Sequence, residues 1–203
     1  MKFMKWKKFI ITALVCLLPI VLGLALWNRL PDTVAIHFNI HGEADGWASK
    51  PFAVFGLPVM MAALQFFCCF VNDINAHHNG ERKKFSTITK WIIPVMCIVL
   101  QIATLGYGLG WNIDMRRVAM IILSTIFIVL GNYMPKFDHI KNCKVDAEKA
   151  RKVNRFIGIE MVILGILALI SIFLPPIYSV IWLILLIPFV ITSVIYGIVV
   201  AKK

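Results

Sequence analysis

Four side chains in the segment 28–51 have the chemistry of metal ligands. His37, His41, Glu43 and Asp45 place two imidazoles and two carboxylates within nine residues, and zinc and similar borderline metals prefer such ligands. A strand rises about 3.3 Å per residue, so the four groups would converge on one ion only around a favourable turn. The segment shows no dedicated metal-ligand spacing, and we therefore expect neither a metal nor another cofactor.

Two other interpretations of this segment need no bound ion. His37 and Asn39 could hold a polar loop together through hydrogen bonds, which would be a structural role. Alternatively, the segment recognises an external partner, because loops between rigid elements commonly carry function. The candidate binding residues are His37, Asn39, His41, Gly42 and Asp45.

A short extended strand is the element expected to position these residues. Apolar residues occupy every second place from 34 to 40, and His37, Asn39 and His41 fall in the other places. This period of two predicts one apolar face, lying on helix ends or the membrane interface, and one polar face that points to the exterior. The sequence HGEADGW that follows contains two glycines and an Asp-Gly step, so we expect the chain to turn there.

The rest of the chain has the composition of a membrane protein. Of its 203 residues, 60% are hydrophobic and 15% are charged, whereas a soluble domain is about half apolar and about a quarter charged. About 20 apolar residues are needed to cross a hydrocarbon core of about 30 Å. Such runs lie at 9–27, 52–71, 91–111, 118–134, 156–174 and 180–200. The sequence therefore predicts an all-α polytopic membrane protein, a six-transmembrane-helix bundle with a short extended outer loop.

Basic residues are distributed unevenly between these spans. All but four of the 21 Lys and Arg residues lie in the N-terminal segment, the connections 73–90 and 135–155, and the C-terminus. By the positive-inside rule, these segments and both termini are cytoplasmic. The basic charge is therefore a topology signal that also attracts anionic lipid headgroups. We expect no nucleic-acid binding, because the charge is spread over several segments without a recognition-helix pattern.

The predicted spans and connections divide the chain into three parts. A two-span unit with the outer loop 28–51 covers residues 1–72, and a basic cytoplasmic loop covers 73–90. A four-span unit covers 91–203 and contains the second basic cytoplasmic loop at 135–155.

Three polar residues fall inside the predicted spans. Glu160 is the only charged one, and it could reach the interface, pair with Lys152 or Arg155, or form a proton or ligand site. Gln65 and Gln101 lie deep in the second and third spans, where interhelical hydrogen bonds of roughly 0.6 kcal/mol are the usual role of such residues.

The chain contains one glycine pattern typical of helix contacts and no catalytic motif. Gly106 and Gly110 form a G-x-x-x-G pattern, which favours close helix packing or, alternatively, a homo-oligomer. The chain contains no nucleophile-and-base set, phosphate-cradling glycine loop or H-E-x-x-H motif. We therefore do not expect an enzyme.

The stretch LPDTVAIHFNIHGEADGW, residues 30–47, resembles the N-terminal domain of the SdpI-type bacterial immunity proteins. That domain joins a first span to Leu-Pro, then His-Phe-Asn, then Gly and an Asp-Gly turn, then a second span. The matching positions are Leu30, Pro31, His37, Phe38, Asn39, Gly42, Asp45 and Gly46.

The second half of the chain resembles the same family at two places. GNYMPK at 131–136 and KVNRFIG at 152–158 are similar to the two ends of the family's C-terminal cytoplasmic stretch. The interval between them reads FDHIKNCKVDAEKAR, and it lacks the Asn-Tyr, Gly-Ile-Arg and Pro-Trp-Thr signature that the family carries there.

The resemblance implies a multi-pass protein of the bacterial plasma membrane that gives immunity to a membrane-active toxin or peptide. The outer loop would meet the secreted toxin, and the cytoplasmic face would signal by holding a repressor protein. One alternative is a small transporter or export accessory protein, with Glu160 and Gln101 lining its pathway. A second is a metal-dependent membrane enzyme that uses the imidazoles and carboxylates of the outer loop.

Overall fold

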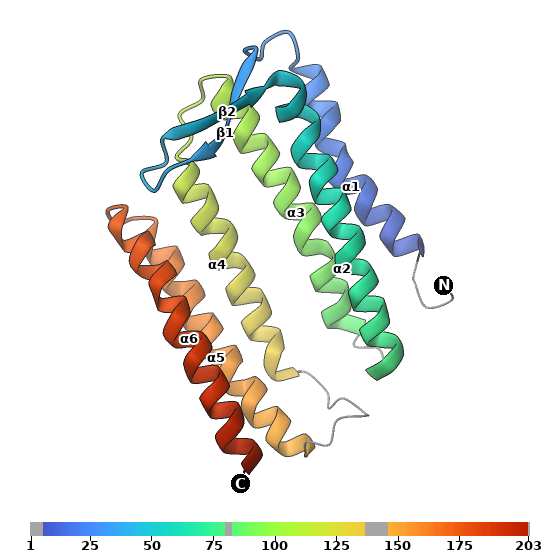
Figure 1. Ribbon diagram of the computed structural model, residues 1–203, viewed down its shortest axis with the longest axis vertical. Coiled ribbons are helices and arrows are strands. Elements are labelled where there is room, and N and C mark those ends of the chain that lie inside the picture. The colour runs from blue at the N-terminus through green and yellow to red at the C-terminus, as the bar shows by residue number, and fades with distance from the viewer. Residues whose placement is uncertain (1–5, 80–82, 137–145, 203) are drawn as a thin grey trace. The chain divides into compact units, whose positions relative to one another are not determined.

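The computed structural model describes residues 6–79, 83–136 and 146–202, which form six long helices and a two-stranded hairpin (Figure 1). A π-helical segment, η1 (Phe52–Gly56), precedes the second long helix, and a 3-10 turn, η2 (Met134–Lys136), follows the fourth. The long elements are α1 (Trp6–Ala25), β1 (Thr33–Phe38), β2 (Ala44–Ser49), α2 (Leu57–Asn79), α3 (Lys83–Gly108), α4 (Met115–Tyr133), α5 (Ala147–Ser171) and α6 (Ile177–Lys202).

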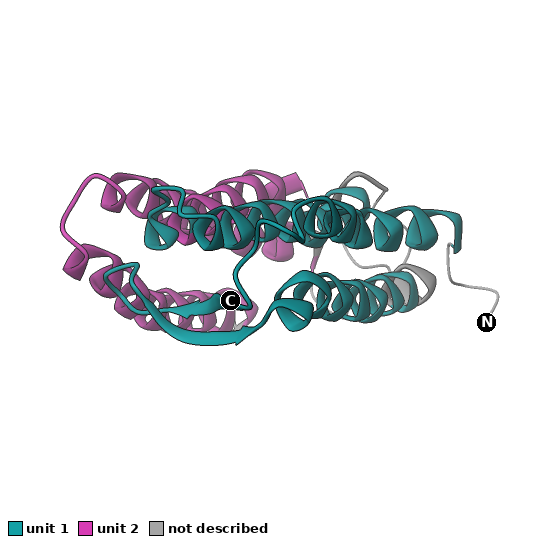
Figure 2. Ribbon diagram, turned by 90° about the horizontal axis from the view of Figure 1, so that it is seen from above, with its two compact units in different colours: residues 1–118 teal, residues 119–203 magenta. Residues whose placement is uncertain are grey.

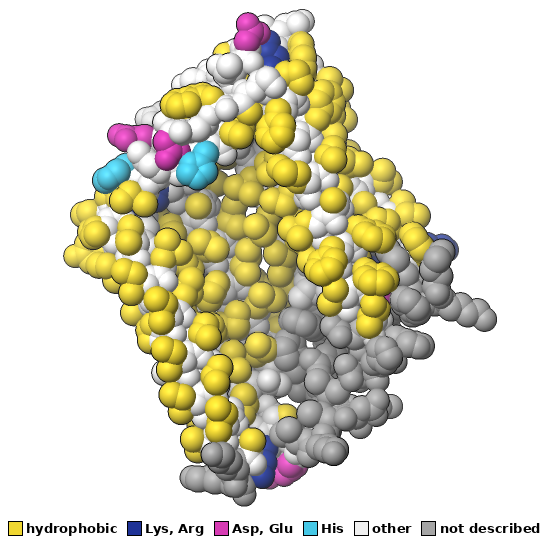
Figure 3. Space-filling model, in the orientation of Figure 1, with side chains coloured by type: hydrophobic (Ala, Val, Ile, Leu, Met, Phe, Trp, Pro, Cys, Tyr) yellow, Lys and Arg dark blue, Asp and Glu magenta, His cyan; other side chains and the backbone are white. Residues whose placement is uncertain are grey.

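The predicted fold class is confirmed, because all six helices are long and apolar enough to cross a membrane. Large hydrophobic side chains cover the helix surfaces (Figure 3). In α6, no residue of the most apolar stretch of 18 residues is buried. Such surfaces are unfavourable in water and expected in lipid, so the chain is a multi-pass membrane protein.

The helices group into two compact units, residues 1–118 and 119–203 (Figure 2). This division differs from the one expected from the sequence, because α3 packs on both α1 and α2 and so belongs with them. The connection predicted at 73–90 is mostly helical, since α2 continues to Asn79 and α3 begins at Lys83. Similarly, α5 begins at Ala147, well before the predicted start of its apolar run, while residues 137–145 of that predicted loop lie outside the described residues.

Small side chains allow close packing in the first unit. Cys16, Cys69 and Cys97, one from each of α1, α2 and α3, are fully buried. The thiol of Cys97 donates to the backbone oxygen of Cys16 at 3.3 Å. At Gly23 of α1, a Cβ atom would lie 2.6 Å from a methyl of Val54, so only glycine fits without a shift.

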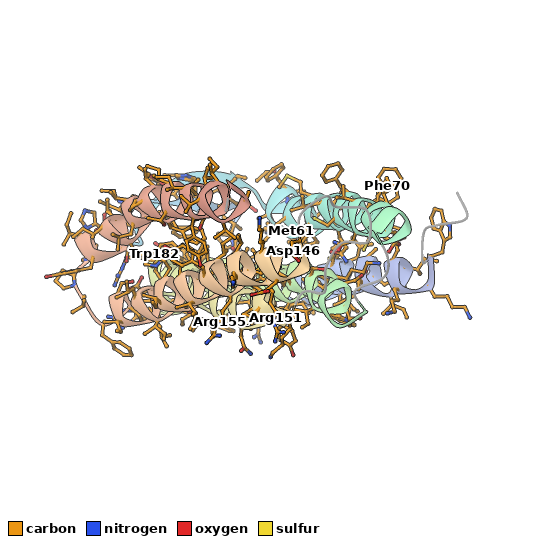
Figure 4. All side chains as sticks on the ribbon, turned by 90° about the horizontal axis from the view of Figure 1, so that it is seen from below. Met61, Phe70, Asp146, Arg151, Arg155 and Trp182 are labelled. Carbon is orange, nitrogen blue, oxygen red and sulfur yellow. The ribbon has the colours of Figure 1, made fainter. Side chains whose placement is uncertain are left out.

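The second unit is built around an indole. Trp182 of α6 is 2% exposed and packs with Met120, Ala168 and Ile172 (Figure 4). Its Nε1–H donates to the backbone oxygen of Leu164 at 2.6 Å, which satisfies the polar end of an otherwise apolar side chain.

Candidate functional site

The hairpin is held at the end of the first unit where α1 and α3 end and α2 begins (Figure 1). β1 and β2 pair antiparallel, from Thr33 opposite Ser49 to Phe38 opposite Ala44. Val34 is 1% exposed, and the ring of Phe38 meets Tyr107 of α3 edge-on at 4.9 Å. The apolar side of the hairpin is thus packed on α3, which positions the polar residues above it.

The strict alternation expected along β1 is wrong at Ala35 and Ile36. Ala35 is 4% exposed and Ile36 is 43% exposed, the opposite of the predicted sides. The ladder is irregular at Ile36, because Ala35 pairs with Trp47 and the next paired residue, His37, pairs with the adjacent Gly46. This irregularity accounts for the exposure of Ile36. An extra residue in one strand of a pair changes which side the following residues face.

The chain turns at residues 39–43 rather than at the Asp-Gly step. Asn39 Oδ1 accepts from the backbone N–H groups of His41 at 2.9 Å and Glu43 at 3.0 Å, and Asn39 Nδ2 donates to Glu43 Oε2 at 3.1 Å. Gly42 has φ of +82°, which favours glycine. Asp45 and Gly46 lie within β2, a strand that the sequence pattern did not predict.

The tip of this hairpin packs on the start of α4. A Cβ atom at Gly42 would lie 2.9 Å from Asp114 Oδ1 and 3.4 Å from the backbone nitrogen of Arg116. Asp114 caps α4 by accepting from the N–H of Arg117 at 3.0 Å, and its carboxylate also pairs with the side chains of Arg116 and Arg117 at 3.7 and 3.0 Å. Asn39 and Gly42 therefore shape and seat the tip.

His37 and Asp45 are the two predicted binding residues whose side chains the structure brings together. Their Nδ1 and Oδ1 atoms lie 2.5 Å apart, and the side chains are 74% and 43% exposed. His41 is exposed, and its backbone N–H rather than its ring makes the contact with Asn39. Within the ranges that the structure describes, no three His, Cys, Asp or Glu side chains gather as metal ligands do.

Apolar side chains are exposed next to this polar pair. Trp47 is 60% exposed and Ile40 is 54% exposed, and acidic and imidazole groups gather over the same hairpin (Figure 3). A surface that combines an indole, aliphatic groups and an imidazole–carboxylate pair can bind an amphipathic peptide or lie at a headgroup layer.

Both intramembrane glutamines bind backbone atoms of a neighbouring element. Gln101 Nε2 of α3 donates to the oxygen of Ala53 in η1 at 2.9 Å, and Gln65 Nε2 of α2 donates to the oxygen of Lys90 in α3 at 2.8 Å. Both side chains are fully buried. Gln101 therefore ties α3 to the π-helical segment η1 through its backbone.

The sequence suggested that Glu160 is the only charged residue inside a span, and this is wrong. Asp73 and Lys90 lie in the candidate spans Phe52–Ile74 and Ser86–Gly108. Their side chains are 2% and 3% exposed, with Lys90 Nζ 2.5 Å from Asp73 Oδ1. The sequence did not indicate the pair because Asp73 and Lys90 lie just outside the predicted apolar runs 52–71 and 91–111. Since α2 and α3 are consecutive and antiparallel, such flanking charges fall at the same level, and this signal could have found the pair.

Glu160 contacts hydroxyl groups of α6. Its Oε1 accepts from Thr192 at 2.7 Å and its Oε2 accepts from Ser193 at 3.0 Å. An ion pair of Glu160 with Lys152 or Arg155 does not form in the described part of the chain, where Lys152 pairs with Glu148 at 2.8 Å and Arg155 is exposed.

The hairpin lies inside the region that matches a known family. A model of the family described as "Domain of unknown function (DUF1648)" matches residues 14–62. The match runs from within α1 through both strands and η1 into the start of α2, and it ends before α3. No curated protein and no solved structure matches the chain.

Proposed function

We propose that this is an SdpI-like protein of the bacterial plasma membrane that gives immunity to a membrane-active toxin or peptide. The observation that carries the proposal is the exposed surface of the hairpin, which carries Trp47 and Ile40 as well as the His37–Asp45 pair. Membrane-active peptides are amphipathic, and this surface offers both apolar and polar contacts to such a ligand.

The architecture of the first unit supports an outward-facing hairpin. α1 starts next to the basic N-terminal segment, and the basic junction between α2 and α3 lies at the same end of the unit. The hairpin lies at the opposite end. If the basic end is cytoplasmic, the hairpin meets peptides on the outer face before they enter the bilayer, and six spans return the C-terminus to the cytoplasm.

The hairpin is also preorganised for binding. Asn39 closes the turn through both of its amide atoms, and Gly42 seats the turn against Asp114. A surface that is already ordered loses little conformational entropy when a ligand binds.

We also propose that the cytoplasmic side of the protein contacts a repressor protein. The first turns of α5 present exposed cationic side chains, including Arg151 and Arg155 (Figure 4). They fit a partner with an acidic surface, because opposite potentials favour encounter and fix register.

The proposal is tested by protection of a sensitive bacterial host against a panel of membrane-active peptides. We expect the wild type to raise survival against at least one peptide, and Trp47→Ala and the double variant His37→Ala/Asp45→Ala to lose most of that protection at equal membrane levels. Asp32→Ala is the matched control, because Asp32 is fully exposed at the base of the same hairpin and pairs with Lys50 at 3.2 Å. Full protection by both hairpin variants, or none by the wild type, contradicts the proposal.

A further inference from the structure

We propose that Glu160, Thr192 and Ser193 form a proton-binding site inside the membrane-spanning part of α5 and α6. This inference is independent of the immunity function, since it concerns other helices and another chemistry. Glu160 is half-buried and lies in the candidate span Glu148–Ser171, and both hydroxyl residues lie in the span Ile177–Ala201.

The site lies away from the polar ends of both helices. Thr192 is separated from Lys202, the first charged residue that follows it in α6, by about 15 Å at 1.5 Å per residue. Glu160 lies more than one turn beyond Arg155, the last basic residue of α5. An acidic side chain within a membrane-spanning segment is costly, and it marks a candidate functional site.

No cationic partner neutralises Glu160 in the described part of the chain. Lys152 binds Glu148, and Lys136 of η2 lies over the ring of Tyr133 at 4.7 Å. The other ionisable groups on elements packed around the site are Lys149, Arg151 and Arg155 of α5, and Tyr178 and Tyr196 of α6. The ring of Tyr196 stacks on Phe156 at 4.2 Å between centroids. With neutral hydroxyls as its partners, the carboxyl group can become neutral by taking up a proton.

The hydroxyl geometry satisfies both protonation states. Thr192 Oγ1 lies 2.7 Å from Glu160 Oε1, 2.9 Å from the oxygen of Pro188 and 3.1 Å from the oxygen of Phe189. A hydroxyl has one hydrogen and can also accept, whereas a backbone carbonyl only accepts. When Glu160 is ionised, Thr192 donates to it. When Glu160 is protonated, its O–H donates to Thr192 Oγ1, and the Thr192 hydroxyl turns to donate to Pro188.

A second acid within a candidate span, Asp73, has different surroundings. Asp73 is buried against the ammonium group of Lys90, whereas Glu160 accepts from two neutral hydroxyls. Ser193 keeps its hydrogen bond to Glu160 in both states, so uptake of a proton at Glu160 requires only the rotation of one hydroxyl group.

The test is a pH series of labelling with a hydrophobic carbodiimide on the full-length protein in membranes. This reagent adds to a protonated carboxyl group in apolar surroundings, and peptide mass spectrometry locates the adduct. We expect an adduct on Glu160 whose rate of formation falls as the pH rises. Labelling of the wild-type protein alone tests the proposal. Glu160→Gln is the negative control and should form no adduct at this position.

The hydroxyl groups are tested with Thr192→Val/Ser193→Ala. Both hydroxyls contact the carboxyl group, so their loss should change how the labelling rate at Glu160 depends on pH. Thr125→Val is the matched control, because the Thr125 hydroxyl bonds the Ile121 oxygen of its own helix at 2.8 Å; it should leave this pH dependence unchanged. Absence of the adduct at every pH, a rate independent of pH, or protection by sodium at constant pH would overturn the proposal, the last by assigning the site to a metal cation.

Discussion

Lys90 of α3 and Asp73 of α2 form a hydrogen-bonded ion pair of 2.5 Å whose side chains are 3% and 2% exposed. Two charges thus stay buried where α2 packs on α3. The pair is joined to its surroundings through the main chain, because the backbone oxygen of Lys90 accepts from Gln65.

Removing one partner of this pair should destabilise the first unit. Lys90→Met leaves the Asp73 carboxylate buried without its ammonium partner, and we expect a loss of about 3–5 kcal/mol in the free energy of unfolding. The double variant Asp73→Leu/Lys90→Met should recover a large part of that loss. Unfolding in detergent micelles measures both variants. A loss at Lys90 no larger than that of Lys152→Met, where the side chain is 59% exposed, would contradict this prediction.

A comparison of Gly42 with Gly110 distinguishes backbone strain from steric contact as the cost of adding a side chain. Both have φ of +82°, so alanine is strained at either position. A Cβ atom at Gly42 also meets Asp114 Oδ1 at 2.9 Å, whereas nothing lies within 4 Å of one at Gly110. We expect Gly42→Ala to cost about 1 kcal/mol more than Gly110→Ala, and to speed hydrogen exchange of the amides of residues 39–43. Equal costs would show that Asp114 moves away freely.

A second glycine comparison tests the packing of the second unit. A Cβ atom at Gly158 of α5 would lie 2.6 Å from the backbone oxygen of Gly131 in α4, and one at Gly197 of α6 meets nothing within 4 Å. Gly158→Ala should therefore lower the melting temperature in detergent. Gly197→Ala should leave the melting temperature unchanged or raise it, because alanine favours a helix by about 1 kcal/mol over glycine. A melting temperature that Gly158→Ala leaves unchanged would mean that α4 and α5 can separate at little cost.

Much of the helical fold could be predicted, because each span is a continuous apolar run whose length matches a bilayer. The ends of the helices could not, since Asp73 and Lys90 look like loop charges until their partners are known. β2 was missed for another reason. Its sequence, ADGWAS, has low strand propensity by itself, and the strand forms through its pairing with β1.

The candidate sites were predicted in part. Asn39 and His37 stood out by type and spacing, but the bulges that turn Ile36 outward and bring Asp45 to His37 depend on the pairing of two strands. Glu160 was recognised as a polar residue in a span, whereas its hydroxyl partners are 32 and 33 residues away along the chain. Such a contact depends on the packing of α5 on α6, which no local pattern contains.

The proposed orientation is tested with single cysteines at two exposed positions. His41 is exposed in the hairpin and Lys152 is exposed near the start of α5. In a cysteine-free background, His41→Cys should react with a membrane-impermeant maleimide in intact cells, and Lys152→Cys should react only after permeabilisation. Reaction of both positions in intact cells would place the hairpin and the basic segment in one compartment, against the charge distribution.

The junction between β2 and the second helix has a mechanical consequence. β2 ends at Ser49, and helical geometry starts at Lys50, continues through η1 and enters α2 without an intervening loop. Gln101 holds the carbonyl groups of this junction from α3. A displacement of the hairpin is therefore transmitted directly to α2 through continuous helical backbone. An insertion of glycines after Ser49 would remove this coupling.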